Sequence, residues 1–169
     1  MAAVVLVIFL HNSFFQIEED KIKETITQEL LKTEGKNYTI QDIQMRKQLD
    51  LKFRKIVVYS FPSADEREII GTANLYKGLN NKYAVGEIYC QKKFVYLFVV
   101  KDFATKYLII AGKNNQSNID YIELTNKEGN SYKEDISKEE YFIYKKNVNL
   151  LRSYRMLDKE GKEIPLAPF

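Results

Sequence analysis

The sequence predicts an α+β protein: a long N-terminal helix, then an antiparallel meander sheet, then a smaller all-β part that is sandwich-like or barrel-like. Three observations support this order. No charged side chain precedes Glu18, and the segment that follows places apolar residues at helical spacing. From residue 38 onward, apolar and polar residues alternate between turn signals. Strand-like segments shorten near the C-terminus, so we divide the chain into parts 1–17, 18–101 and 102–169.

The opening of the chain predicts a membrane anchor or a signal-type helix. Residues 2–10 read Ala-Ala-Val-Val-Leu-Val-Ile-Phe-Leu and are apolar on every face, a pattern that is buried in lipid or in a large core. Since no small-residue cleavage site follows, we expect the segment to be retained as an anchor. A span takes about 20 apolar residues, so either Met1 is not the natural start or the run is a core element of a soluble protein.

The next segment predicts an amphipathic helix that continues the apolar one. Ile22, Ile26 and Leu30 recur every four residues and therefore share one helix face, and Gly35 is a stop signal. Glu19 and Lys23 have the spacing of a helical ion pair. We expect the apolar face to pack on a sheet, and a coiled-coil stalk is the alternative.

Alternation and turn chemistry predict a series of strands in the middle part. Pro62 begins one turn, and Gly78 with two asparagines marks a hairpin loop. The strand at residues 93–100 is apolar on both faces, which is typical of a central strand. The expected strands are residues 40–45, 49–61, 67–76, 82–90 and 93–100.

A helix followed by a meander of antiparallel strands resembles the cystatin-like and NTF2-like folds. The resemblance is one of element order over residues 18–101. It implies a curved sheet that wraps the helix, with a space between them that could hold a small ligand.

The C-terminal part repeats the strand rhythm in shorter pieces. Turn signals lie at residues 126–129 and 158–161, and residues 113–118 form a polar loop. Short strands at even spacing indicate a small sandwich or barrel, and one sheet running across both halves of the chain is the alternative. The expected strands are residues 107–111, 119–124, 132–136, 141–144 and 150–157.

Three stretches of this part resemble other proteins in sequence. They are Tyr107-Leu-Ile-Ile-Ala-Gly112, Ile119-Asp-Tyr-Ile-Glu-Leu124 and the ending Tyr154-Arg-Met-Leu-Asp-Lys-Glu-Gly161. Together with the apolar opening, they are similar to small membrane-anchored extracytoplasmic proteins of Gram-positive bacteria, many of them uncharacterised. The resemblance implies a single-pass protein of the cell membrane, with its domain outside the cytoplasm.

Composition argues against several chemistries. The net charge of +3 is spread along the chain, so we expect no nucleic-acid partner. A single histidine, His11, and a single cysteine, Cys90, cannot make a zinc site, and we expect neither a metal nor another cofactor. We expect His11 at an interface and Cys90 half-buried in a strand.

We also expect no nucleophile–histidine catalysis and hence no enzyme, because nucleophiles of this type need a base. A pair of carboxylates could still perform acid–base chemistry. The acids in or beside strands are expected to be turn or edge residues: Asp42, Asp50, Asp102 and Asp120.

The tyrosines are the remaining candidates for a binding surface, because tyrosine is enriched at protein interfaces. The candidates are Tyr83, Tyr89, Tyr96, Tyr121, Tyr132, Tyr141, Tyr144 and Tyr154. The resulting hypothesis is a non-enzymatic binding or scaffolding domain, tethered by its N-terminal helix, with an envelope protein or a glycan as partner. The alternatives are a pocket domain for a small ligand and a component of a bacterial secretion or conjugation assembly. The sequence does not fix the oligomeric state.

Overall fold

The computed structural model describes residues 13–35, 38–63, 68–91, 94–114 and 118–165. The chain forms two compact units, residues 1–91 and 92–169, and each is described by itself. The expected boundary lay ten residues later, before Asp102. The strand expected at residues 93–100 pairs with strands that follow it, so it belongs to the second unit.

The helix of the first unit is short, not long as predicted. A 3-10 turn, η1 (Glu19–Lys21), leads into α2 (Ile22–Glu34). Glu18 has extended backbone angles and Ile17 forms a β-bridge, so the helix does not continue into the apolar opening. Among the described residues, no helix is long and apolar enough to cross a membrane. Residues 1–12, which include the predicted anchor and His11, lie outside the described part of the chain.

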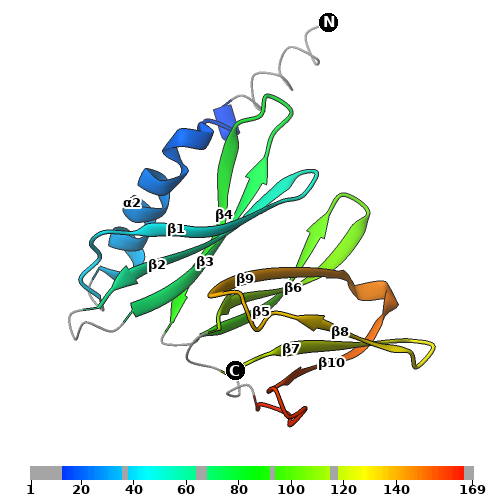
Figure 1. Cartoon of the computed structure of the whole chain (residues 1–169). Helices are drawn as coiled ribbons and strands as arrows, with labels where there is room; N and C mark the ends of the chain where they lie inside the picture. Colours follow the sequence, from blue (N-terminus) through cyan, green and yellow to red (C-terminus); the bar gives the residue numbers. More distant parts are fainter. Residues whose placement is uncertain (1–12, 36–37, 64–67, 92–93, 115–117, 166–169) are drawn as a thin grey trace, which may run out of the picture. The chain divides into compact units, whose positions relative to one another are not determined.

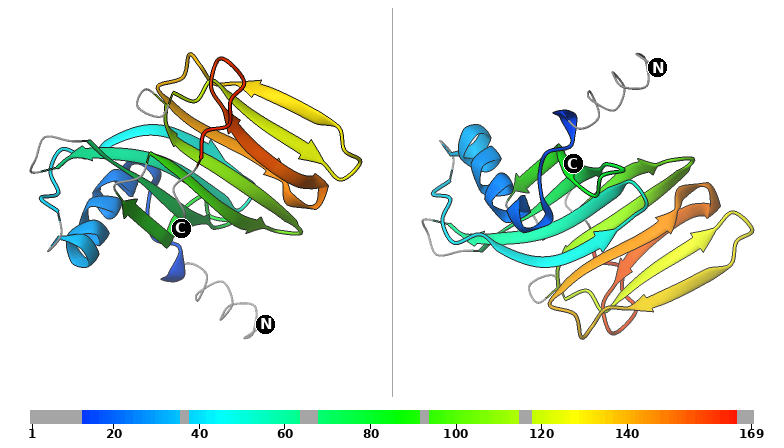
Figure 2. Two further views of the ribbon diagram at one scale, coloured as in Figure 1. Left: turned by 90° about the horizontal axis from the view of Figure 1, so that it is seen from below. Right: turned by 90° about the horizontal axis from the view of Figure 1, so that it is seen from above.

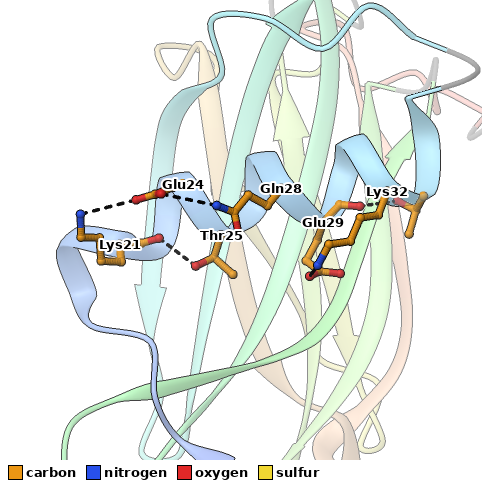
Figure 3. Close-up of polar contacts among 7 residues, drawn as sticks. Lys21, Glu24, Thr25, Gln28, Glu29 and Lys32 are labelled. Carbon is orange, nitrogen blue, oxygen red and sulfur yellow. Dashed lines mark hydrogen bonds and ion pairs between the residues drawn. The ribbon is translucent and has the colours of Figure 1, made fainter.

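The solvent-facing side of α2 is held by local polar contacts (Figure 3). Lys21 and Lys32 form ion pairs of 3.5 and 2.7 Å with the glutamates three positions away, Glu24 and Glu29. The Glu19–Lys23 pair expected from the spacing is replaced by a contact between Glu19 and Lys55 of the sheet. Exposed pairs of this kind contribute little stability, so packing of the apolar face determines where the helix lies.

The sheet of the first unit is the predicted antiparallel meander. Its strand order is β1-β2-β3-β4, and each strand pairs with the next along the chain. The first strand begins at Gln44 and not at residue 40 as predicted. The strand predicted at residues 49–61 is divided, because Leu51 and Phe53 lie in the β1–β2 turn. The strands are β1 (Gln44–Asp50), β2 (Arg54–Pro62), β3 (Glu68–Lys77) and β4 (Tyr83–Gln91).

The core of the first unit lies between α2 and one face of this sheet (Figures 1 and 2). Ile22, Ile26 and Leu30 are at most 2% exposed, which confirms the predicted apolar face. Opposite them, the fully buried Tyr59 lies across from Gly71 on the neighbouring strand. A side chain at Gly71 would collide with the Tyr59 ring, so this glycine gives the ring its room.

The second unit contains two three-stranded antiparallel sheets, ordered β5-β6-β9 and β10-β7-β8. The strand predicted to be central, β5, is an edge strand, because within the described part of the chain it pairs with β6 alone. Its Val99 is 55% exposed. The elements are β5 (Val95–Asp102), β6 (Thr105–Lys113), β7 (Tyr121–Asn126), β8 (Ser131–Asp135), β9 (Tyr141–Asn147), η2 (Val148–Leu150) and β10 (Leu151–Leu157).

Both sheets contribute to the core of the second unit. Leu108 and Phe142 come from one sheet, and Ile122 and Met156 from the other. The predicted turns at residues 126–129 and 158–161 are present, and each contains a glycine with positive φ. Apart from the 3-10 turn η2, the described secondary-structure elements of this unit are strands.

Candidate functional site

The segment after the apolar opening is fastened to the edge of the first sheet. The backbone N–H of Ile17 donates to the carbonyl of Tyr83 at 3.0 Å, and Tyr83 N–H donates to the carbonyl of Ile17 at 2.7 Å. Tyr83 is the first residue of β4, so this short extended segment lies beside the edge strand of the sheet. The chain therefore enters the first unit at a fixed place.

Side chains reinforce this attachment. The Asn80 amide donates to the carbonyl of Phe15 at 3.2 Å, and Lys82 Nζ lies 2.9 Å from Glu18 Oε1. The hydrogen bond and the charge of Lys82 hold the pKa of Glu18 below its ordinary value. We call residues 15–18 and 80–83 together the tether junction.

A buried lysine lies next to the tether junction. Lys55 is 2% exposed, and its Nζ donates to Glu19 Oε1 at 2.8 Å and to Gln48 Oε1 at 3.2 Å. Its third partner is Asp50, 3.0 Å away, and the Tyr83 ring lies 5.7 Å from the ammonium group. Burial alone would lower the pKa of Lys55, but the hydrogen bonds to the two carboxylates outweigh it and raise that pKa. Lys55 thus connects η1 to the β1–β2 hairpin.

The β3–β4 turn beside the junction has a well-defined shape. Gly78 N–H donates to the carbonyl of Lys82 at 2.8 Å, and Lys82 N–H donates to the Asn80 side chain at 3.1 Å. Asn81 adopts a positive φ of 58°, which asparagine tolerates better than most residues. At the tip of this turn, Leu79 is 80% exposed.

The first unit also has a hollow of about 350 Å³ along the start of β1, the end of β2 and the start of β3. Asp42, Arg46 and Glu68 are among its lining residues. Arg46 Nε donates to Ser60 Oγ at 2.7 Å, and its guanidinium pairs with Glu68 at 3.0 Å. Two of the charges that line this hollow, Arg46 and Glu68, therefore already pair with each other.

The second unit has a polar hollow of about 450 Å³. Asp120, Asp158 and Glu160 contribute carboxylates to its lining, and Lys159 contributes an ammonium group. Asn114 supports its wall, because its buried amide donates to the carbonyl of Ile136 at 2.8 Å. Among the described residues, no three His, Cys, Asp or Glu side chains gather as metal ligands would.

The four acids singled out in the sequence lie at strand ends or in the connections before strands. Asp50 ends β1 and contacts Lys55, while Asp102 ends β5. Asp42 and Asp120 precede β1 and β7 and line the two separate hollows.

Cys90 lies in β4 and is 7% exposed. Burial raises the pKa of its thiol to about 12. Because the thiolate is the nucleophile, this position does not favour a reactive cysteine.

The eight candidate tyrosines differ in exposure. Tyr83, Tyr96 and Tyr141 are buried. The two exposed members are Tyr89 on β4, at 44%, and Tyr132 on β8, at 36%. Lys146 lies 4.3 Å from the ring of Tyr132, so one face of that ring already has a cationic neighbour.

Sequence reasoning missed the tether junction and Lys55. One signal was available for Lys55: with Arg54, it lies directly before the apolar run of β2. The Ile17–Tyr83 pairing joins residues 66 positions apart and left no local signal.

No protein-family model, curated protein or solved structure matches the chain. The proposals below therefore depend on the geometry of the described residues and on the sequence pattern.

Proposed function

We propose that the chain is a non-enzymatic binding or scaffolding domain, held at the cell membrane by its N-terminal segment, with both units outside the cytoplasm. The observation that carries the proposal is the tether junction. An apolar stretch at residues 2–10 is followed, seven residues later, by the paired backbone hydrogen bonds of Ile17 and Tyr83. An anchor joined in this way would hold the first unit close to the membrane surface.

The exposed tyrosines support the binding role. Tyr89 and Tyr132 offer an apolar ring with a polar tip on strand surfaces, and such side chains are enriched at interfaces. An envelope protein or a glycan is the proposed partner. The relationship to membrane-anchored extracytoplasmic proteins of Gram-positive bacteria that the sequence resemblance implies is part of this proposal. For the second unit we infer a sandwich-like arrangement, because its core draws on both sheets.

A pocket domain of the NTF2-like or cystatin-like type is the alternative. It requires space between the helix and the sheet, and Ile26, Leu30 and Tyr59 fill that region at 0–1% exposure. The packing therefore favours the binding or scaffolding role. A component of a secretion or conjugation assembly is a further proposal, and ordered self-association of the full chain would distinguish it.

The test is cell fractionation of the natural gene product, followed by protease treatment of intact cells. The test variant carries Val5→Lys and Ile8→Lys, which place two charges in the apolar stretch. The control carries Gln28→Lys and Leu31→Lys, two exposed positions on α2. We expect the wild type and the control to pellet with membranes and to be cleaved from outside, and the test variant to leave the membrane fraction. A wild-type protein that stays in the soluble fraction, protected from protease, would contradict the proposal.

A further inference from the structure

The end of the first unit at the tether junction carries exposed apolar side chains. Leu79, at the tip of the β3–β4 turn, is 80% exposed, and Phe14, directly before the junction, is 60% exposed. Isolated exposed apolar residues are common on protein surfaces. Here the two belong to segments joined by the hydrogen bond from Asn80 to the carbonyl of Phe15. We call Phe14, Lys77, Leu79 and Lys82 the turn-end surface.

The chain that precedes this surface limits its distance from a membrane. Phe14 lies four positions after Leu10, the last residue of the apolar stretch. Even fully extended, four residues span at most about 14 Å. The headgroup layer on each side of a bilayer is about 5–8 Å thick. An apolar stretch embedded in the bilayer would therefore leave Phe14 within or just beyond the headgroup layer.

The tether junction holds the β3–β4 turn beside Phe14, so the turn would also lie near the headgroup layer. The two backbone hydrogen bonds between Ile17 and Tyr83 fix the start of β4 beside the entering chain. The internal hydrogen bonds of residues 78–82 hold Leu79 at the tip. Little conformational freedom remains to be lost when such a turn meets a surface, which favours binding.

Lysines at this end have the charge that suits lipid phosphates. Lys82 is 42% exposed and reaches Glu18, while Lys77 and Lys82 flank the turn. The N–H of Lys77 donates to the carbonyl of Phe53 at 2.8 Å, so the β1–β2 turn with Lys52 lies at the same end. Basic residues next to a bilayer are attracted to anionic lipids.

We propose that the turn-end surface contacts the lipid bilayer that holds the tether, with Leu79 and Phe14 in the headgroup layer and the lysines at lipid phosphates. The inference rests on the proposed membrane attachment and adds which face of the first unit is turned to the lipid. The contact would fix the orientation of the first unit on the membrane.

The experiment uses the full chain reconstituted into vesicles of phosphatidylcholine and phosphatidylglycerol. In a Cys90→Ala background, an environment-sensitive fluorophore is attached at Leu79→Cys. The matched control is Ser63→Cys, at the opposite end of the same sheet, beyond β2. Quenching by a lipid with a spin label in its headgroup reports contact, and vesicle flotation reports attachment.

We expect flotation of both proteins, with quenching at residue 79 at least about threefold stronger than at residue 63. Flotation with equal, weak quenching at both positions would overturn the lipid-contact inference and leave the proposed attachment standing. Failure of both proteins to float would overturn the attachment and the inference with it. In pure phosphatidylcholine we expect weaker quenching at residue 79, because the lysines then lack an anionic partner.

Discussion

Substitutions at Lys55 test how the first unit is held together. Lys55→Ala removes three methylene groups and an ammonium group from a side chain that is 2% exposed. At about 0.8 kcal/mol for each buried methylene, the stem alone accounts for about 2.4 kcal/mol. A residual cavity adds to this, so we expect a loss of about 2–4 kcal/mol in the free energy of unfolding.

The ion contacts of Lys55 are expected to contribute less than its stem. Glu19 and Asp50 have side chains 68% and 56% exposed, so water can replace the ammonium group at both carboxylates. Breaking a fully buried pair costs about 3–5 kcal/mol, but only one partner is buried here. We therefore expect Glu19→Gln and Asp50→Asn each to cost below about 1 kcal/mol. Lys55→Met, which keeps most of the stem, should cost about 1–1.5 kcal/mol.

The assay is urea unfolding of the full chain in a mild detergent. Circular dichroism at a helical wavelength monitors the loss of structure. The reasoning is refuted if Lys55→Met costs as much as Lys55→Ala, or if Glu19→Gln costs as much as either. The pH dependence gives a second check. Because the folded pKa of Lys55 is raised, its charge contributes stability that is fully present below the unfolded pKa, about 10.4, and is lost as the pH rises through the folded pKa. The advantage of the wild type over Lys55→Met should therefore be constant near neutral pH and shrink only in strongly alkaline solution.

Two further substitutions and one labelling reaction test the packing of buried groups. Gly71→Ala should lower the unfolding free energy by about 1–3 kcal/mol, because its new methyl group displaces the Tyr59 ring; unchanged urea unfolding would contradict this. Asn114→Ala should cost about 1–3 kcal/mol in thermal or urea unfolding, since the buried N–H of Ile119 loses its acceptor, the Asn114 side-chain oxygen, and the carbonyl of Ile136 loses one of its two donors; a loss below about 0.5 kcal/mol would refute that role. Cys90 should resist a thiol reagent at pH 8 in the folded protein and react once urea unfolds it, and rapid labelling of the folded chain would show the burial to be wrong.

Much of the strand pattern could be predicted from local sequence. Alternation located strands in both units, and turn residues such as Gly129 and Gly161 marked hairpins that the structure contains. These signals are local, because a side chain's face and a turn's φ depend on nearby residues. The apolar face of α2 was predictable for the same reason.

Pairing between strands was less predictable. The apolar strand β5 suggested a central position, yet β6 pairs with it and with β9 and occupies the centre. An apolar strand can lie at a sheet edge with part of its surface exposed, as Val99 is here, and periodicity does not distinguish an edge strand from a central one. The predicted boundary after residue 101 followed from this assignment.

The candidate site depends on contacts that are distant in sequence. The helix was predicted to continue the apolar opening, because hydrophobicity carries on through Phe14 and Phe15. The structure instead has an extended segment at Ile17, which pairs with Tyr83 at the start of β4, the last strand of the first sheet. Lys55 was missed in the same way, since its partner Glu19 lies 36 positions away.

Hydrogen exchange at the tether junction tests the central claim most directly, namely that the chain enters the first unit at a fixed place. The measurement follows the backbone amides of Ile17 and Tyr83 in the full chain. We expect both to exchange at least about a hundredfold more slowly than in an unstructured peptide, because each donates to the other residue's carbonyl. Exchange of Ile17 at the unstructured rate, while the rest of β4 stays protected, would contradict the account.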